Sequence, residues 1–150
     1  MMDAIDQQIA EILQTNGRVS SAEVAQAVGV SVSTANDRIR RLHTVGIVTE
    51  WRGVLDPARV GAGVCIFVLI DMKYEGEEQA CAALRSCPEV QELHHISGPH
   101  SYLMKLRVRD MPAFQAFLKN TVKPLPAVIG TETLISLDTL KETSAVRISV

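Results

Sequence analysis

The first third of the chain has the hydrophobic spacing of three amphipathic helices. Residues 3–16 predict the first helix, because its apolar side chains fall on one stripe between a capping aspartate and a glycine. Ser20 opens a capping box at the start of a second helix, and Gly29 ends it. Ser31 caps a third helix that runs to about Val45. Three helices with a tight glycine-containing turn before the third predict a helix-turn-helix.

Residues 47–55 predict a short hairpin, or wing, directly after the third helix. An Asp-Pro breaker and two nearby glycines follow it and add flexibility. We therefore place a linker at residues 53–62, between a winged helix-turn-helix at 1–52 and a second domain at 63–142. Residues 143–150 are expected to form a C-terminal tail.

The second half of the chain alternates between strand-like and helix-like patterns in the order β-α-β-β-α-β. This order is the ferredoxin-like, split βαβ arrangement, and the predicted fold class is α+β. The expected strands are 64–72, 90–97, 101–109 and 128–137, and the expected helices are 77–86 and a segment capped by Asp110 that ends before Pro124.

The first of these strands is apolar on both faces. A ferredoxin-like sheet carries helices on one face only, so its other face should be polar in a monomer. An exposed apolar face of this size predicts a homodimer that stacks two sheets. The pattern does not decide which set of side chains meets the partner: Val64, Ile66, Val68 and Ile70, or Cys65, Phe67 and Leu69.

Composition indicates a folded protein, with 47% hydrophobic and 21% charged residues. No apolar run reaches the roughly 18 residues that a membrane helix needs, and the acidic N-terminus is unlike a signal sequence. We therefore expect a cytoplasmic protein without membrane contact. The three cysteines form no CxxC pair, and adjacent strand histidines at 94 and 95 point to opposite faces, so we expect neither a metal site nor a cofactor.

The third helix carries the candidate DNA-binding residues. At about 100° per residue, Val32, Ala35, Ile39 and Leu42 share one side of this helix. The opposite side is short, polar and partly basic, which suits base edges and phosphates in the major groove of double-stranded DNA. A solvated helix or a protein-binding module would show a similar pattern. The candidates are Ser33, Thr34, Asp37, Arg40 and Arg41, with Ser31 at the helix start and Arg38 on the flank facing the DNA backbone.

The charge of the chain limits how strongly one subunit can bind DNA. The chain has a net charge of −2, and residues 1–57 contain five Lys or Arg against seven Asp or Glu. One subunit should therefore bind DNA weakly, and linked half-sites in a dimer or larger assembly would supply the affinity.

Several motifs, in order and spacing, resemble the leucine-responsive regulator/AsnC family. They are Ile5-Asp6-x-x-Ile9-x-x-x-Leu13, Gly17-Arg18-Val19-Ser20, Leu42-x-x-x-Gly46-Ile47-Val48, Leu55-x-Pro57, Val108-Arg109-Asp110-Met111, Leu125-Pro126 and Thr131-x-Thr133. The resemblance covers nearly the whole chain. It implies a transcriptional regulator with a winged helix-turn-helix, dimers that assemble into octamers or related rings, and an amino-acid or similar effector held between neighbouring C-terminal domains.

The turn before the third strand departs from the family pattern. The family often has Gly-x-x-Asp-Tyr there, and this chain has Ser101 in place of the aspartate. A neutral hydroxyl pairs with an ammonium group more weakly than a carboxylate does, so either the effector is not an ordinary α-amino acid or one binds loosely. Thr131 and Thr133 either contact the ligand or simply fill the strand. The expected effector-binding residues are Gly98, His100, Ser101, Tyr102, Thr131 and Thr133.

A dimeric ferredoxin-like enzyme is the rival class of function. The sequence offers no Ser/His/Asp order, no glycine-rich phosphate loop and no paired-carboxylate motif. An enzyme would also leave the helix-turn-helix unexplained. We therefore expect a DNA-binding regulator rather than an enzyme.

Overall fold

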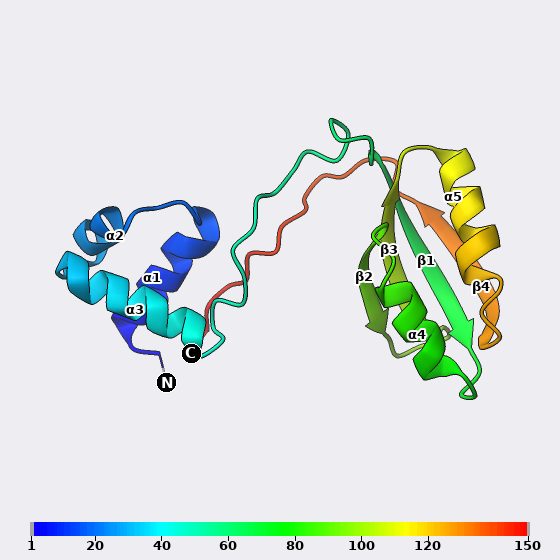
Figure 1. Ribbon diagram of the computed structural model, residues 1–150, viewed down its shortest axis with the longest axis horizontal. Helices are drawn as coiled ribbons and strands as arrows, with labels where there is room; N and C mark the ends of the chain where they lie inside the picture. Colours follow the sequence, from blue (N-terminus) through cyan, green and yellow to red (C-terminus); the bar gives the residue numbers. More distant parts are fainter. Residues whose placement is uncertain (1, 150) are drawn as a thin grey trace. The chain divides into compact units, whose positions relative to one another are not determined.

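The computed structural model describes residues 2–149 and divides into two compact units (Figure 1). The N-terminal unit contains the chain up to Val54 together with the segment from Lys141 onward, and the C-terminal unit is Leu55–Leu140. The chain therefore passes between the units twice.

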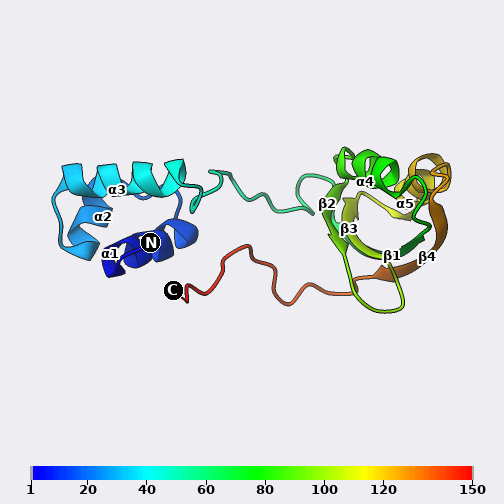
Figure 2. The same ribbon diagram turned by 90° about the horizontal axis from the view of Figure 1, so that it is seen from below.

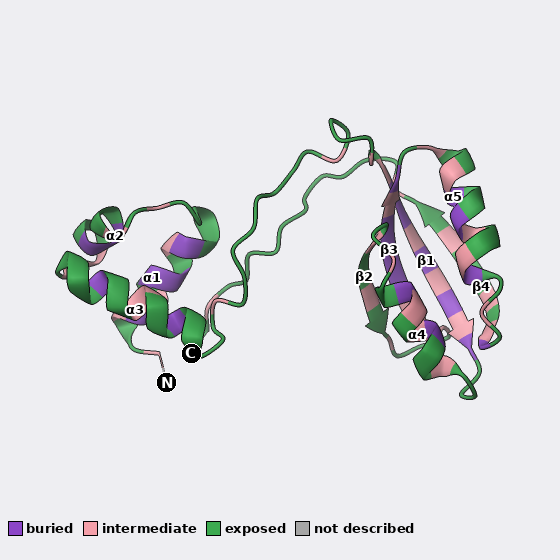
Figure 3. Cartoon of the chain, viewed as in Figure 1, coloured by how far each residue is buried: buried purple, intermediate pink, exposed green. Residues whose placement is uncertain are grey.

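The N-terminal unit contains the three expected helices, α1 (Ala4–Thr15), α2 (Ser21–Val28) and α3 (Val32–Thr44). Asp3 and Ser20 form capping boxes, and the hydroxyl of Ser31 accepts a hydrogen bond from the Thr34 N–H. Gly29 ends α2 with a φ of 73°, which glycine adopts without steric cost. The buried core of the unit is Ile9, Leu13, Val24, Ala25, Ala35 and Leu42 (Figure 3).

The predicted hairpin over residues 47–55 is wrong, because the structure assigns no strand to that segment. The N–H groups of Ile47 and Val48 both donate to the carbonyl of Leu42, at 2.9 and 3.1 Å, and close the end of α3. Donors used in this way are not available for a strand ladder. Farther along, the ring of Trp51 lies against Gly17, where an added Cβ would meet the ring at 3.5 Å.

The last residues of the chain return to α1. The side-chain amide of Gln14 donates to the carbonyl of Val146 at 2.8 Å and accepts from its N–H at 3.0 Å. The side-chain amide of Gln14 therefore bonds both backbone groups of Val146, as a residue of a neighbouring strand would. This segment and residues 47–52 line one pocket of about 640 Å³ in the N-terminal unit. No periodicity in the sequence indicates this docking.

The C-terminal unit is an antiparallel sheet in the order β2-β3-β1-β4, formed by β1 (Val64–Met72), β2 (Val90–His95), β3 (Tyr102–Val108) and β4 (Val128–Ile135). Helices α4 (Glu77–Arg85) and α5 (Met111–Phe117) cover the same face of this sheet (Figure 2), and α5 continues into η1 (Leu118–Val122). The predicted α+β class and ferredoxin-like order are confirmed.

Strand register decides which face of β1 lies under the helices. Ile66, Val68 and Ile70 are fully buried in the core with α4 and α5. The opposite face, which we call the open face, carries Phe67 and Leu69 of β1 beside Leu103 of β3 and Leu134 of β4. These four side chains are half-buried or exposed. No helix in residues 2–149 is both long and apolar enough to cross a membrane.

Candidate nucleic-acid and ligand sites

The outward side of α3 is exposed and polar. Ser33, Thr34, Asp37 and Arg40 all lie on the surface, and the Arg40 guanidinium donates to the Asp37 carboxylate at 2.8 Å. Both of these side chains are well exposed, so water screens the pair and little free energy holds it together. Arg40 is therefore available to exchange Asp37 for a phosphate or a base edge.

Two expected DNA-binding arginines point elsewhere. Arg38 pairs with Asp3 at 2.7 Å and with Asp6 at 2.9 Å, and Arg41 pairs with the other oxygen of Asp6. Arg41 was expected on the outward side of α3 with Arg40, and that placement needs correction. Its position, one residue before the buried Leu42, turns it toward α1.

Asp6 is the buried centre of this network. Its side chain is completely inaccessible, although it carries a charge. Burial alone would raise the pKa of the Asp6 carboxyl, but hydrogen bonds from Arg41 and Arg38 outweigh burial and lower it. Hydrogen bonding to Arg38 also lowers the pKa of Asp3. The network fixes α3 against α1, so these arginines position the outward side of the helix.

Sequence reasoning missed Asn36 and misplaced Val32. Asn36 is exposed, and its amide oxygen accepts a hydrogen bond from the Ser21 hydroxyl of α2 at 3.4 Å, while its N–H₂ group has no hydrogen-bond acceptor among residues 2–149. Helical spacing alone places it between Ser33 and Arg40. Val32 was assigned to the apolar stripe but is 53% exposed, as the first residue of the helix. Ser31 uses its hydroxyl to cap the helix.

The structure separates the expected effector-binding residues between the two faces of the sheet. Tyr102 and Thr131 both pair with Ile70, on the helix side, and Thr133 pairs with Val68 there. Because Ile70 lies between them, Tyr102 and Thr131 are two strand spacings apart, about 10 Å. His100 instead lies on the other face, where its Nδ1 is 3.1 Å from the Asp71 carboxylate and its Nε2 is 3.3 Å from the Glu132 carboxylate.

The turn itself is held by backbone contacts. The Ser101 hydroxyl accepts from the Met72 N–H at 3.4 Å, and the Ser101 N–H donates to the Ile70 carbonyl at 3.1 Å. Gly98 has a φ of 120°, which side chains other than glycine rarely adopt. The structure does not bring the six expected residues together, and their ligand role stays a prediction.

Tyr102 belongs to a different cluster on the helix side of the sheet. Its ring stacks on His95 with centroids 4.9 Å apart, and its hydroxyl donates to Glu77 of α4 at 2.9 Å. Hydrogen bonding with the Cys81 thiol, together with burial and Glu77, raises the pKa of Tyr102. The phenol is therefore neutral and serves as a donor at neutral pH.

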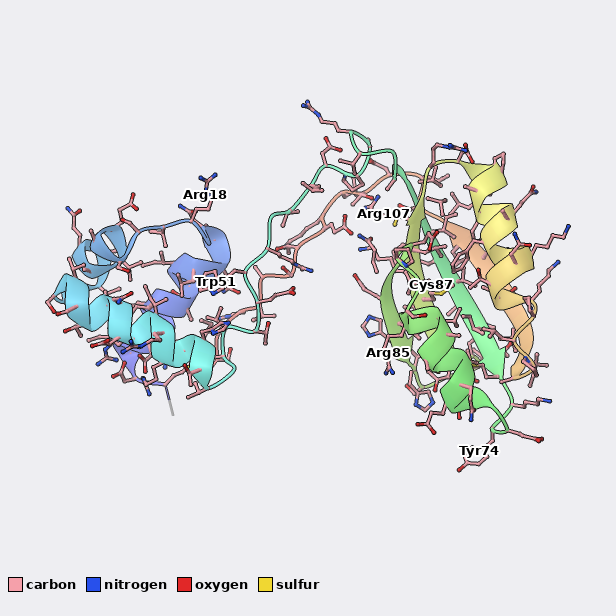
Figure 4. The ribbon with its side chains drawn as sticks, in the orientation of Figure 1. Arg18, Trp51, Tyr74, Arg85, Cys87 and Arg107 are labelled. Atoms are coloured by element: carbon pink, nitrogen blue, oxygen red, sulfur yellow. The ribbon has the colours of Figure 1, made fainter. Side chains whose placement is uncertain are left out.

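A pocket of about 360 Å³ lies beside this cluster, between α4 and the edge strand β2. Figure 4 shows Arg85 at this edge. Arg85 is exposed and has no hydrogen-bond or ion-pair partner among the residues that the structure describes. Within residues 2–149, no three His, Cys, Asp or Glu side chains gather as a metal site. The lining residues are Cys81, Arg85, Val90, Gln91, Glu92, Leu93, His95 and Tyr102.

Comparison with known proteins assigns the family. The AsnC-type helix-turn-helix domain matches residues 2–43, and the Lrp/AsnC ligand binding domain matches residues 65–146. The chain belongs to the Lrp/AsnC family. The leucine-responsive regulatory proteins of Haemophilus influenzae and Escherichia coli K12 are each 34% identical to it over 146 residues, which cover 95% of the chain and 88% and 89% of those proteins.

Solved Lrp/AsnC structures share the fold over almost the whole chain. A transcriptional regulator from Neisseria meningitidis, solved with L-Met, has a TM-score of 0.94 at 28% identity and covers 98% of this chain and 97% of its own. E. coli AsnC has a TM-score of 0.88 at 32% identity, with 97% and 98% coverage. The predicted family is confirmed. This Lrp/AsnC member is a DNA-binding transcriptional regulator with a ligand-binding domain, and its relatives are regulators rather than enzymes.

Proposed function

We propose that this regulator binds double-stranded DNA through the outward side of α3, in the cytoplasm, and that an amino acid or related metabolite controls the binding. The observation that carries the DNA proposal is the exposed Arg40 on a capped helix of a helix-turn-helix. Ser33 and Thr34 donate to or accept from base edges, and Asp37 accepts from cytosine N4. Asn36 extends this set, because an exposed amide can read adenine.

Arg38 and Arg41 have a second role in this proposal. They position α3 through Asp6, and the half-exposed Arg41 also reaches a phosphate. Ser31 and the N-terminus of α3 bind a phosphate through backbone N–H groups of the first helical turn, which lack partners within a helix.

We further propose a homodimer that buries the open face of the sheet and assembles into octamers or similar rings. The four apolar side chains of the open face support this, because an exposed apolar patch on a sheet is rarely left in water. Charged groups border them: Lys105 pairs with Glu92 at 3.2 Å. An apolar centre with a charged border is typical of a stable interface.

The effector proposal rests on the family match and on the ligand named in the Neisseria structure, which is L-Met. The E. coli and Haemophilus relatives are described as leucine-responsive. We therefore expect an amino acid or a metabolite of similar size to bind the C-terminal unit. The turn residues Gly98, His100 and Ser101 remain candidates, as do Thr131 and Thr133.

The test is retention of selected genomic DNA fragments on the full-length protein, with and without a mixture of amino acids. Arg40→Ala should weaken binding to all sequences and reduce the salt slope by about one. Arg18→Ala is the matched control, since it removes the same charge from the turn after α1. Unchanged affinity in folded Arg40→Ala protein would contradict the assignment of this helix side.

A further inference from the structure

The pocket between α4 and β2 has the size and lining of a small-molecule site. Its volume of about 360 Å³ falls in the range of ligand pockets, roughly 300–1,000 Å³. Val90, Leu93 and Cys81 are half-buried and pack against the core, so the floor of the pocket is apolar and firmly held. It lies on the helix side of the sheet, because Val90, Leu93 and His95 pair with core-facing residues of β3. Burial of the open face would leave it accessible.

Arg85 supplies the one charge in this pocket that nothing else in residues 2–149 neutralises. Nearby cations are paired: Lys105 with Glu92, and Arg107 with Gln91 at 3.1 Å. A guanidinium offers parallel N–H donors that match a carboxylate in a two-pronged contact. An unpaired arginine above an apolar floor therefore favours a ligand with a carboxylate and a short apolar body.

The remaining walls add hydrogen-bonding groups at fixed positions. The Tyr102 hydroxyl is held by Glu77, and its ring is stacked on His95. On the other side, β2 is an edge strand, and an edge presents unpaired backbone N–H and C=O groups. Backbone carbonyls there can accept from an ammonium group, and N–H groups can donate to a keto oxygen.

We propose that this pocket binds a small monocarboxylate of amino-acid or 2-oxo-acid size, with its carboxylate on Arg85 and its apolar body on Val90 and Leu93. The inference rests on the proposed function and gives the effector a binding site that includes Tyr102 but not Gly98, His100 or Ser101 of the turn. In this site the carboxylate is the main recognised group, so the loss of an acidic residue at Ser101 does not prevent binding.

The cysteines allow the site to be located directly. Cys81 lines the pocket, whereas Cys87 lies outside it and is also half-buried. The full-length protein is screened by thermal shift against the twenty L-amino acids, their 2-oxo acids and the matching amines that lack a carboxylate. With the best member of the panel, iodoacetamide labelling of each cysteine is followed by mass spectrometry. We expect Cys81 labelling to slow at least fivefold and Cys87 labelling to stay unchanged, with no amine in the panel effective.

Two variants test the role of Arg85. Arg85→Gln should weaken binding of that compound about tenfold or more, equivalent to about 1.4 kcal/mol, and Arg85→Lys should lose less. Lys119→Gln is the control, because it removes a cation from an exposed position of η1, outside the pocket. His100→Ala and Thr131→Ala should leave binding by the pocket intact.

DNA retention with the same compounds separates this inference from the proposed function. One outcome is a compound that alters DNA binding without slowing Cys81 labelling and acts equally on the Arg85→Gln protein. That result would place the effector site outside the pocket, while the proposal that an effector controls DNA binding would stand. If no compound in the panel binds or alters DNA retention at millimolar concentration, the pocket assignment and the effector proposal both fall.

Discussion

The two units use arginine in opposite ways. In the N-terminal unit, Arg38 and Arg41 are taken up by the carboxylates of Asp3 and Asp6, and they set the position of a reading helix. In the C-terminal unit, Arg85 has no partner in the described chain and stands at a concave pocket. A basic residue on a helix therefore does not by itself indicate a ligand. Its function depends on whether the fold provides a carboxylate to neutralise it.

The units also differ in what they leave uncovered. The N-terminal unit exposes polar residues on α3, and the C-terminal unit exposes an apolar sheet face. The first surface suits a hydrated, charged partner such as DNA, and the second suits burial against another protein surface.

Phe67→Asp should cause loss of the dimer or aggregation. The substitution would place a charge at the centre of the open face, and burying an unpaired charge costs several kcal/mol or more. Size-exclusion chromatography with light scattering measures the change. Tyr74→Asp is the control, because Tyr74 is 94% exposed in a loop. A Phe67→Asp protein with the oligomeric state of the parent would show that the open face is not the interface.

Asp6→Ala should destabilise the N-terminal unit by about 3 kcal/mol, because it leaves the guanidinium groups of Arg38 and Arg41 without their shared partner. The C-terminal unit should melt as before. Calorimetry of the full chain measures the two transitions, and circular dichroism of the helical signal supports the assignment. Equal loss of stability in both units would argue that they do not unfold separately.

Acid should weaken the N-terminal unit through the same network. The pKa values of Asp3 and Asp6 lie below the ordinary 3.8 in the folded state, so their contribution is fully present well above pH 3.8. It is lost as the pH falls below 3.8 and through the folded-state values. Thermal melts from pH 6 to pH 2 measure this, and the Asp6→Ala variant should show a shallower dependence over that window.

Gln14→Ala should have the smallest effect, about 1 kcal/mol or less on the N-terminal unit, since its two hydrogen bonds with Val146 are exposed to water. The expected readout is faster amide hydrogen exchange at residues 144–148. Gln8→Ala provides the comparison, as an exposed glutamine on the same helix. Slow exchange retained in Gln14→Ala would show that other contacts hold this segment.

The sequence alone determined the helices and strands of both units, because each has a strong local signal. Capping residues and glycines mark the ends of α1, α2 and α3, and a continuous apolar run of strand length marks β1. The hairpin at residues 47–55 failed because its pattern is weak, and the donors of Ile47 and Val48 bond to the end of α3. Because successive side chains of a strand point to opposite faces, the apolar run also showed that β1 is apolar on both faces.

Only the tertiary structure decided which of these residues meet. The open face of β1 follows from where α4 and α5 pack, and Asp6 meets Arg38 and Arg41 across more than thirty positions of sequence. The docking of Val146 on Gln14, over a separation of 132 residues, has no local signal. Helical and strand periods fix the direction of a side chain within its own element, whereas its partner depends on how the elements are packed.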